Sequence, residues 1–350
     1  MKKTLVSILT IASGIAAAVM VCLAVFAVST AIPYPGHPAG IASVPLMLGM
    51  LVNQANIQAL YINYRTIFNE AFAAAPTFWE NVAMRSPSTT GIEDYKWLSE
   101  FPQMRKWVGD KQVKNLEGYD YVLKNEDFES TIAVNRNDIE DDKVGIYTPR
   151  IQGAGRAAKV WPDLLVFQLL TDGFTAKCFD GQPFFAAAHQ FGKVTFCNKG
   201  TKKLSATSQA AAIASYGAAR TALLSMTDDQ GTPLGLAPNV LVVSPENADV
   251  ANALMTVDRL DDGKANLYKG SAKVIVVPFL QGPAWFLMDT SMPIKPLIFQ
   301  VRKDPEFIAH TDPNSDSVFN RKEFKFGAEA RGNVGFGLPQ MAYGSDGSVA

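Results

Sequence analysis

The sequence predicts a mixed α+β fold, and three observations carry that prediction. The longest helical pattern of the chain runs from Thr148 to Gly173. Between residues 205 and 288, the order helix–strand–helix–strand–strand is typical of a compact α/β subdomain. Strands predicted before and after this subdomain would then combine with the long helix into a separate mixed element.

The long helix has recognisable signals at both ends. Thr148 is expected as its N-cap, Pro149 suits the first helical position, and Gly173 suits the end. At 1.5 Å per residue, about 23 residues give a rod of roughly 35 Å. Pro162 should kink or restart this rod, because proline lacks an N–H and collides with the preceding turn. The apolar second half indicates a helix that is buried or packed on two sides.

A second, amphipathic helix is predicted upstream, from Asn53 to Ala75. Two interpretations stay open: the helix packs on its own domain, or it is an arm that packs on a neighbouring subunit. Its apolar face is broad rather than a narrow stripe and comprises Leu60, Ile62, Tyr64, Ile67, Phe68 and Phe72.

The segment between these two helices mixes large aromatic residues with many charges. After a loop at Arg85–Thr90, strands are predicted at Leu116–Leu123 and Phe128–Val134, around a polar turn at residues 124–127. Large aromatic residues on a projecting element tend to be interface anchors, whereas an ordinary meander on the core is the alternative. The predicted contacts with a neighbouring subunit are Tyr95, Trp97, Phe101, Trp107, Tyr119 and Tyr121.

The α/β subdomain begins with an alanine-rich helix at Ser205–Met226. A strand at Asn239–Ser244 and a short helix from Pro245 to Met255 follow. Later strands are predicted at Lys273–Val277, Trp285–Met288, Leu297–Arg302 and Arg321–Phe326.

The first 31 residues resemble a secretory signal or a membrane anchor, with Lys2 and Lys3 before an apolar run from Leu5 to about Val28. Two interpretations compete. The protein is exported or anchored, or the first 49 residues are an upstream in-frame extension and translation begins at Met47 or Met50.

Composition excludes several classes of function. A chain of 350 residues allows one to three domains, and a net charge of −1 gives no field that attracts nucleic acid or an anionic membrane. Three cysteines, Cys22, Cys178 and Cys197, are too few for a disulfide framework and favour a reducing compartment. A single Cys178–Cys197 bridge stays open.

Two patterns suggest ligand sites, and each has a simpler explanation. Gly153 and Gly155 nearly match a dinucleotide fingerprint, but they lie inside a helix, where small residues more often permit close packing. The acidic cluster Asp138, Glu140, Asp141 and Asp142 lacks the spacing and glycine of a calcium loop. A solvated face, or charge near the next helix start, is expected there.

A catalytic or metal centre is not predicted. Cys178, His189 and Cys197 lack the paired spacing of a structural zinc site, and a Cys178–His189 thiol nucleophile has no evident orienting partner. We therefore expect no catalytic residue, metal or cofactor. A cytoplasmic hydrolase that uses Cys178 is a third interpretation.

Several stretches resemble the major head (capsid) subunit family of Mu-like phages and prophages. The resemblance covers the chain from about Met50 to Tyr343. It is carried by SPSTTGIEDYKWLSEFPQMRKWVGD (86–110), FESTIAVNRNDIEDDKVGIY (128–147), WPDLLVFQLLTDGF (161–174), CFDGQPFF (178–185) and RKEFKFGAEARGNVGFGLPQMAYGS (321–345).

This resemblance implies the tailed-phage capsid fold of Hong Kong 97 type. The parts it implies are a signal-like extension (1–49), an N-terminal arm (50–83), an extended loop over a neighbour (84–128), a peripheral domain (129–204) with a spine helix at about 148–173, an axial domain (205–277) and a returning peripheral part (278–350).

The resemblance also implies assembly rather than catalysis. Copies would form hexamers and pentamers of an icosahedral head in the virion, assembled in the host cytoplasm. Scaffold, a maturation protease, the portal and weakly held double-stranded DNA would be partners, without stable membrane association. Covalent cross-linking has no support in the residues. Because family members begin near Met50, the resemblance favours a mis-called start. The alternative is an exported or membrane-anchored α/β binding protein.

Overall fold

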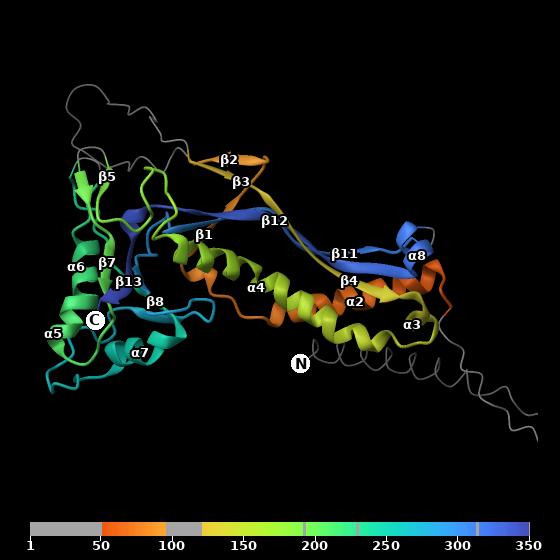
Figure 1. Ribbon diagram of the computed structural model, residues 1–350, viewed down its shortest axis with the longest axis horizontal. Coiled ribbons are helices and arrows are strands. Elements are labelled where there is room, and N and C mark those ends of the chain that lie inside the picture. The colour runs from red at the N-terminus through yellow and green to blue at the C-terminus, as the bar shows by residue number, and fades with distance from the viewer. Residues whose placement is uncertain (1–50, 96–120, 192–193, 229–230, 313–314, 350) are drawn as a thin grey trace, which may run out of the picture. The chain divides into compact units, whose positions relative to one another are not determined.

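The computed structural model describes residues 51–95, 121–191, 194–228, 231–312 and 315–349, all within one unit, Gly49–Ala350 (Figure 1). The helical segments are α2 (Gln54–Ala74), η1 (Trp79–Asn81), α3 (Arg136–Glu140), η3 (Val144–Tyr147), α4 (Thr148–Asp172), α5 (Gln209–Ala212), η4 (Ile213–Gly217), α6 (Ala218–Leu224), η5 (Pro245–Asn247), α7 (Ala248–Thr256), α8 (Asp316–Arg321) and η6 (Pro339–Met341). The strands are β1 (Ala83–Pro87), β2 (Ile92–Asp94), β3 (Val122–Lys124), β4 (Glu126–Asn135), β5 (His189–Phe191), β6 (Val194–Phe196), β7 (Lys199–Lys202), β8 (Val240–Val243), β9 (Lys273–Val276), β10 (Trp285–Met288), β11 (Leu297–His310), β12 (Glu323–Phe336) and β13 (Ala342–Val349).

A four-stranded sheet has the order β1-β11-β12-β4. Its two central strands, 14 residues each, pair antiparallel, β4 pairs antiparallel with β12, and β1 pairs parallel with β11. The strand predicted at Leu297–Arg302 is confirmed and extends to His310. The strand predicted at Arg321–Phe326 begins at Glu323, because Arg321 ends helix α8, and it extends to Phe336. The loop predicted at Arg85–Thr90 was wrong in its first half, because Arg85–Pro87 belongs to the edge strand β1, where proline is tolerated.

The helix α4 confirms the long helix and corrects its start. Pro149 lies in its first turn and Gly173 is its C-cap. The N-cap is Tyr147 rather than Thr148, and no side chain caps this end. One continuous helix runs through Pro162, so the proline does not restart it.

Helix α2 packs on its own chain. Asn53 caps it, because its side-chain Oδ1 accepts a hydrogen bond from the Asn56 N–H at 2.8 Å. Of the predicted apolar face, Leu60, Tyr64 and Phe68 are buried against α4, β11 and β12, whereas Ile62 is 57% exposed. Of the two interpretations left open by the sequence, packing on its own domain is therefore the one that holds for α2 within the single chain.

Helices α2 and α4 lie side by side (Figure 1). Gly155 of α4 lies where the two helices approach closely. A Cβ atom at this position would lie 2.5 Å from the carbonyl oxygen of Phe68 and 3.1 Å from the Cβ of Ala71. The packing interpretation is thus confirmed for Gly155. Gly153 has no neighbour within 4 Å of such an atom, so it lacks this reason to be glycine.

Asp163 is the one acidic residue between Pro162 and Leu170 of α4, and its carboxylate has a structural role. Its Oδ1 accepts hydrogen bonds from the backbone N–H of Phe78 at 3.0 Å and of Trp79 at 2.7 Å. These bonds hold the start of η1 against the helix. Burial nevertheless raises the pKa of Asp163 above its usual range, because desolvation of the carboxylate outweighs the hydrogen bonds.

A five-stranded sheet has the order β7-β13-β10-β8-β9. Strands β8 and β10 are buried at every position, because one hydrophobic cluster covers each face of the sheet. Helices α6 and α7 contribute to one cluster, and the second half of α4 contributes to the other. The sheet draws strands from residues 199–349, so it crosses the predicted boundary at Val277.

The alanine-rich helix predicted at Ser205–Met226 is a helical segment, Gln209–Leu224, in three parts. Ser208 caps it, accepting a hydrogen bond from the Ala211 N–H at 3.2 Å, and η4 is a π-helical turn in its middle. The helix is therefore confirmed with shorter ends.

Two members of the acidic cluster after β4 pair with cations of the same chain. In α3, Arg136 Nε lies 2.9 Å from Glu140, and just beyond it Lys143 Nζ lies 2.8 Å from Asp141. All four of these side chains are about half exposed. The arrangement agrees with the expected solvated face.

Candidate functional site

A short hairpin lies between β1 and β4, the two edge strands of the four-stranded sheet. In it β2 and β3 pair antiparallel, with Ile92 opposite Lys124 and Asp94 opposite Val122. Only Asn125 separates β3 from β4, so the turn predicted at residues 124–127 was wrong and the hairpin continues almost directly into the sheet (Figure 1). Residues 96–120, between the two hairpin strands, lie outside the described part.

The turn that begins the hairpin is organised by one carboxylate. Glu93 Oε1 accepts hydrogen bonds from the Ser88 hydroxyl at 2.9 Å and from the backbone N–H groups of Thr89 at 2.8 Å and Thr90 at 3.0 Å. The bonds from Thr90, Ser88 and Thr89 stabilise the charged form and lower the pKa of Glu93 to about 2. This turn is therefore held in place at neutral pH.

A buried polar network anchors the base of the hairpin. Asn125, 3% exposed, donates through Nδ2 to the Ser88 hydroxyl and to the Thr90 carbonyl, each at 2.8 Å. Its Oδ1 accepts from Gln300 Nε2 at 2.7 Å, and Gln300 Oε1 accepts from the Tyr95 hydroxyl at 2.9 Å. The network joins the hairpin to the first part of β11, at Gln300.

Two of the six predicted neighbour contacts lie in the core of their own chain. Tyr95 is 3% exposed, and the hydroxyl of the partly buried Tyr121 accepts a hydrogen bond from the Phe336 N–H at 2.8 Å. Burial raises the pKa of Tyr121 to about 12. For these two positions the core alternative, not the interface, fits the single chain. Trp97, Phe101, Trp107 and Tyr119 lie outside the described residues.

An apolar groove opens between α4 and the strands β4 and β12. Its volume is about 210 Å³, and Phe128, Trp161, Leu164 and Ala330 contribute to its lining. Trp161 packs on Phe128 with ring centroids 4.9 Å apart. The indole N–H of Trp161 is buried and has no acceptor among the described residues. A mostly apolar groove of this kind is suited to apolar or aromatic side chains of a neighbouring segment.

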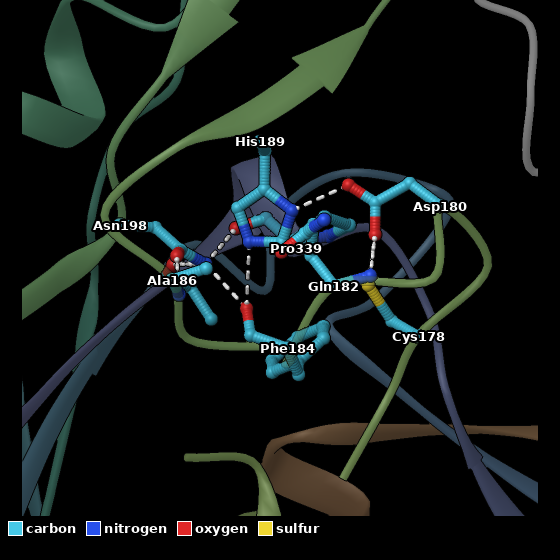
Figure 2. A network of polar contacts seen from close by, with 9 residues as sticks. Cys178, Asp180, Gln182, Phe184, Ala186, His189, Asn198 and Pro339 are labelled. Atoms are coloured by element: carbon cyan, nitrogen blue, oxygen red, sulfur yellow. Dashed lines mark hydrogen bonds and ion pairs between the residues drawn. The ribbon is translucent and has the colours of Figure 1, made fainter. Parts of the chain in front are cut away.

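A second polar cluster follows α4, where the chain turns toward β5 (Figure 2). Cys178 Sγ lies 3.0 Å from Asp180 Oδ1, and His189 Nδ1 lies 2.7 Å from Asp180 Oδ2. His189 Nε2 faces the carbonyl oxygen of Phe184 at 3.2 Å. Cys178 and His189, considered together from the sequence, are thus close in space, with Asp180 as the member that sequence reasoning missed.

Cys197 does not join this cluster. It is exposed and Cys178 is buried, and both are free thiols, so the Cys178–Cys197 bridge that the sequence left open is absent. Burial raises the pKa of the Cys178 thiol, and the Asp180 carboxylate raises it further. A thiol held protonated and away from solvent is not a nucleophile, which argues against the Cys178 hydrolase.

The charge of Asp180 is stabilised inside this cluster. Burial acts to raise its pKa, but hydrogen bonds from His189 and Cys178 outweigh burial and keep the pKa below its usual range. The Asp180 side chain is 4% exposed and that of His189 is 0% exposed.

A long helix beside a four-stranded sheet, a second sheet buried on both faces and a hairpin at the sheet edge define the class of protein: a structural subunit with the tailed-phage capsid fold of Hong Kong 97 type. The chain belongs to the family described as Mu-like prophage major head subunit gpT, whose model matches residues 57–213, 202–280 and 281–350. It is a virion protein of the major capsid type and not an enzyme.

Two relatives of known identity support this assignment. The major capsid protein of Escherichia phage Mu is 32% identical over 300 residues, which cover 86% of this chain and 76% of the relative. The FluMu major head subunit, from a Mu-like prophage of Haemophilus influenzae, is 28% identical over 293 residues, covering 84% of this chain and 74% of the relative.

Solved capsid structures share the fold. The subunit in the procapsid of bacteriophage JBD30 is 31% identical with a TM-score of 0.53, covering 84% of this chain and 76% of that one. The subunit in the JBD30 capsid decorated with minor capsid protein trimers gives a TM-score of 0.54 at 28% identity, covering 61% of this chain and 94% of that one.

These relatives give no support to the alternative of an exported or anchored binding protein. Among the described residues, no helix combines the length and the apolar character that a bilayer crossing requires. The apolar run before residue 31, and with it the hypothesis of a start at Met47 or Met50, lies outside the described residues.

Proposed function

We propose that the chain self-assembles into hexamers and pentamers that form an icosahedral head around packaged DNA. In this proposal the four-stranded sheet with α2 and α4 is the peripheral domain, α4 is its spine helix, and the five-stranded sheet with α5–α7 is the axial domain.

The observation that carries the proposal is the groove beside Trp161. The lining of this groove is mostly apolar, so an apolar or aromatic side chain of a second copy would be removed from water there. The hairpin of a second copy is the proposed occupant, and Trp97, Phe101, Trp107 and Tyr119 are its proposed contacts. Repeated around a ring, such contacts add through multivalency.

Scaffold, a maturation protease and the portal are the further proposed partners. DNA contact is proposed to be weak and non-specific, because a net charge of −1 supplies no general attraction to phosphate.

The test is assembly of the full chain co-expressed with its scaffold, followed by negative-stain electron microscopy. We expect large regular particles; only small monodisperse species would contradict the proposed function. Intact-mass measurement of the particle protein then tests where translation begins. A mass that includes residues 1–49 would reject a start at Met47 or Met50.

The substitution Trp161→Phe tests the groove itself. It shortens an aromatic side chain that packs on Phe128 and lines the groove, so we expect a modest loss of unfolding stability and a larger loss of particles. Tyr121→Phe is the matched control: it strips the Phe336 N–H of its acceptor within one chain and should lower stability without a specific loss of particles. Normal particle yield for Trp161→Phe would reject the groove as the contact. Trp107→Ala should likewise impair particle formation more than folding.

A further inference from the structure

Three buried side chains of different chemistry converge after α4. The sulfur of Cys178, a carboxylate oxygen of Asp180 and a ring nitrogen of His189 all lie within 4.8 Å of one another. Cys178 is 5% exposed, and the side chains of His189 and Asp180 are 0% and 4% exposed. Groups of this kind are buried together only when they are paired or when they hold a metal ion.

The orientation of the His189 ring limits what can lie between it and Asp180 (Figure 2). Both ring nitrogens face oxygens that act as acceptors: Nδ1 lies 2.7 Å from Asp180 Oδ2, and Nε2 lies 3.2 Å from the carbonyl oxygen of Phe184. A neutral imidazole carries only one N–H, so it can donate to only one of these two oxygens. A metal ion bound at Nδ1, with the hydrogen on Nε2, would satisfy both nitrogens.

The chemistry of the donors favours a metal ion, and we propose that Cys178, Asp180 and His189 bind Zn²⁺. Thiolate, imidazole and carboxylate are the ligands that Zn²⁺ takes in proteins. A histidine ligand typically donates its second ring N–H to a backbone carbonyl, as His189 can to Phe184. Around a tetrahedral ion neighbouring ligand atoms lie about 3.3 Å apart, so the His189–Asp180 contact of 2.7 Å and the Cys178–Asp180 contact of 3.0 Å would both open slightly. The fourth position falls to water or to another oxygen.

The ion would tie together a part of the fold that has little regular structure. Cys178 and Asp180 lie in the turn after α4, whereas His189 begins β5. The Phe184 carbonyl that orients His189 also accepts from Asn198 Nδ2 at 2.8 Å, which fixes it from the other side. Zn²⁺ therefore cross-links the connection between α4 and the five-stranded sheet, a role that goes beyond assembly.

Binding must release a proton, because the thiolate rather than the thiol is the ligand. Burial raises the pKa of Cys178, so this proton is held firmly at neutral pH. The apparent affinity should rise about tenfold per pH unit for one released proton.

The experiment uses the purified full-length chain, whether or not it assembles, so its result is separate from the assembly test. Metal content after dialysis against buffer and thermal unfolding with added Zn²⁺ are measured. We expect one Zn²⁺ per chain and an upward shift of Tm. The same chain loaded with Co²⁺ should show the absorption of a thiolate–cobalt bond.

Matched variants identify the ligands. Cys178→Ser and His189→Gln should weaken Zn²⁺ binding by at least about tenfold, and Cys178→Ser should remove the thiolate–cobalt absorption. Cys197→Ser is the control, because it removes a free thiol that lies outside the cluster. It should change neither Zn²⁺ binding nor the thiolate–cobalt absorption. Asp180→Asn replaces Cys178→Ser if the latter fails to fold, with the same loss expected.

Two results would overturn the proposal. In the first, the wild-type chain holds no stoichiometric metal and its Tm does not respond to Zn²⁺, so the cluster is a buried imidazolium–carboxylate pair. In the second, Zn²⁺ binds but Cys197→Ser, rather than Cys178→Ser, His189→Gln or Asp180→Asn, abolishes it.

Discussion

The two sheets of this subunit bury their strands in different ways. In the five-stranded sheet, β8 and β10 are buried at every residue, because hydrophobic clusters cover both faces. In the four-stranded sheet, β4 alternates: Ile132 and Val134 are buried under α2 and α4, whereas Thr131 and Ala133 on the other face are exposed. Both faces of the five-stranded sheet are thus covered by residues of its own chain. One face of the four-stranded sheet, here called the open face, is exposed among the described residues.

The difference teaches where a shell subunit can meet its neighbours at low cost. A contact on the open face of the four-stranded sheet disturbs no core residue, whereas any contact with β8 or β10 would require the fold to open. Substitutions in the two sheets should therefore separate folding from assembly.

The largest effect is expected in the doubly covered sheet. Phe286 is 0% exposed and packs on Phe185 with ring centroids 5.3 Å apart. Phe286→Ala should lower the free energy of unfolding by about 3–5 kcal/mol, because it leaves a cavity that the sheet cannot close. Urea unfolding of the purified chain measures this.

The matched control lies on the open face, where Ile308 is only partly buried. Ile308→Ala should cost clearly less than Phe286→Ala. Equal losses would mean that the face called open is covered within the chain, and the comparison would fail.

The helical layer over the closed face of the four-stranded sheet should give the next largest effect. Gly155→Ala places a Cβ 2.5 Å from the backbone oxygen of Phe68, so α2 and α4 must separate, at a cost of about 1–3 kcal/mol. Gly153→Ala meets nothing within 4 Å and should stabilise α4 by up to about 1 kcal/mol through helix propensity. Thermal unfolding of both variants provides the check; a Gly155→Ala chain as stable as Gly153→Ala would contradict the close approach.

A smaller effect of opposite sign is expected on the open face. Glu129 of β4 lies directly opposite Glu329 of β12. Glu129→Lys converts a like-charge pair to an opposite one and should raise the free energy of unfolding by about 0.2–1 kcal/mol. If a neighbour uses this face, particle yield should fall at the same time, as electron microscopy would reveal. Stabilisation with a normal yield would leave this face free of contacts.

The smallest effect concerns the turn at the edge of the open sheet. The pKa of Glu93 is lowered in the fold, from 4.5 to about 2, so its contribution to stability is present above pH 4.5. It is lost as pH falls toward about 2, because the unfolded chain takes up the proton first. Glu93→Gln should remove this part of the acid dependence, measured by unfolding between pH 2 and 6. An unchanged pH profile in the variant would show that Glu93 is not held by the turn.

The sequence predicted best those elements whose signals are local. Pro149 and Gly173 bounded α4 closely, and the apolar run Trp285–Met288 is β10 without change. Strand β13, Ala342–Val349, was not predicted, because small and polar residues such as Gly344 and Ser345 give no hydrophobic alternation. The glycine at position 344 is explained only by the fold, because a Cβ on Gly344 would lie 2.8 Å from the Phe185 ring.

The candidate sites show the same limit. Tyr95 and Tyr121 are large aromatic residues in a charged segment, a pattern equally typical of an anchor and of a core residue, and only the partners Gln300 and Phe336 decide between them. Asp180 stands two residues from Cys178, but no spacing rule connects it with His189. The turn between them brings the three together, and that turn depends on packing remote in sequence.

The single residue between β3 and β4 has a mechanical consequence. Tension on the hairpin would pass through Asn125 into β4 along its own axis, and β4 is paired with β12 from Glu126 to Asn135. The hydrogen bonds of an antiparallel pair lie perpendicular to the strands, so such a load is shear and strains the whole ladder at once instead of peeling it bond by bond. When a subunit is pulled by its hairpin, its mechanical resistance would therefore depend on the number of residues over which β4 and β12 are paired.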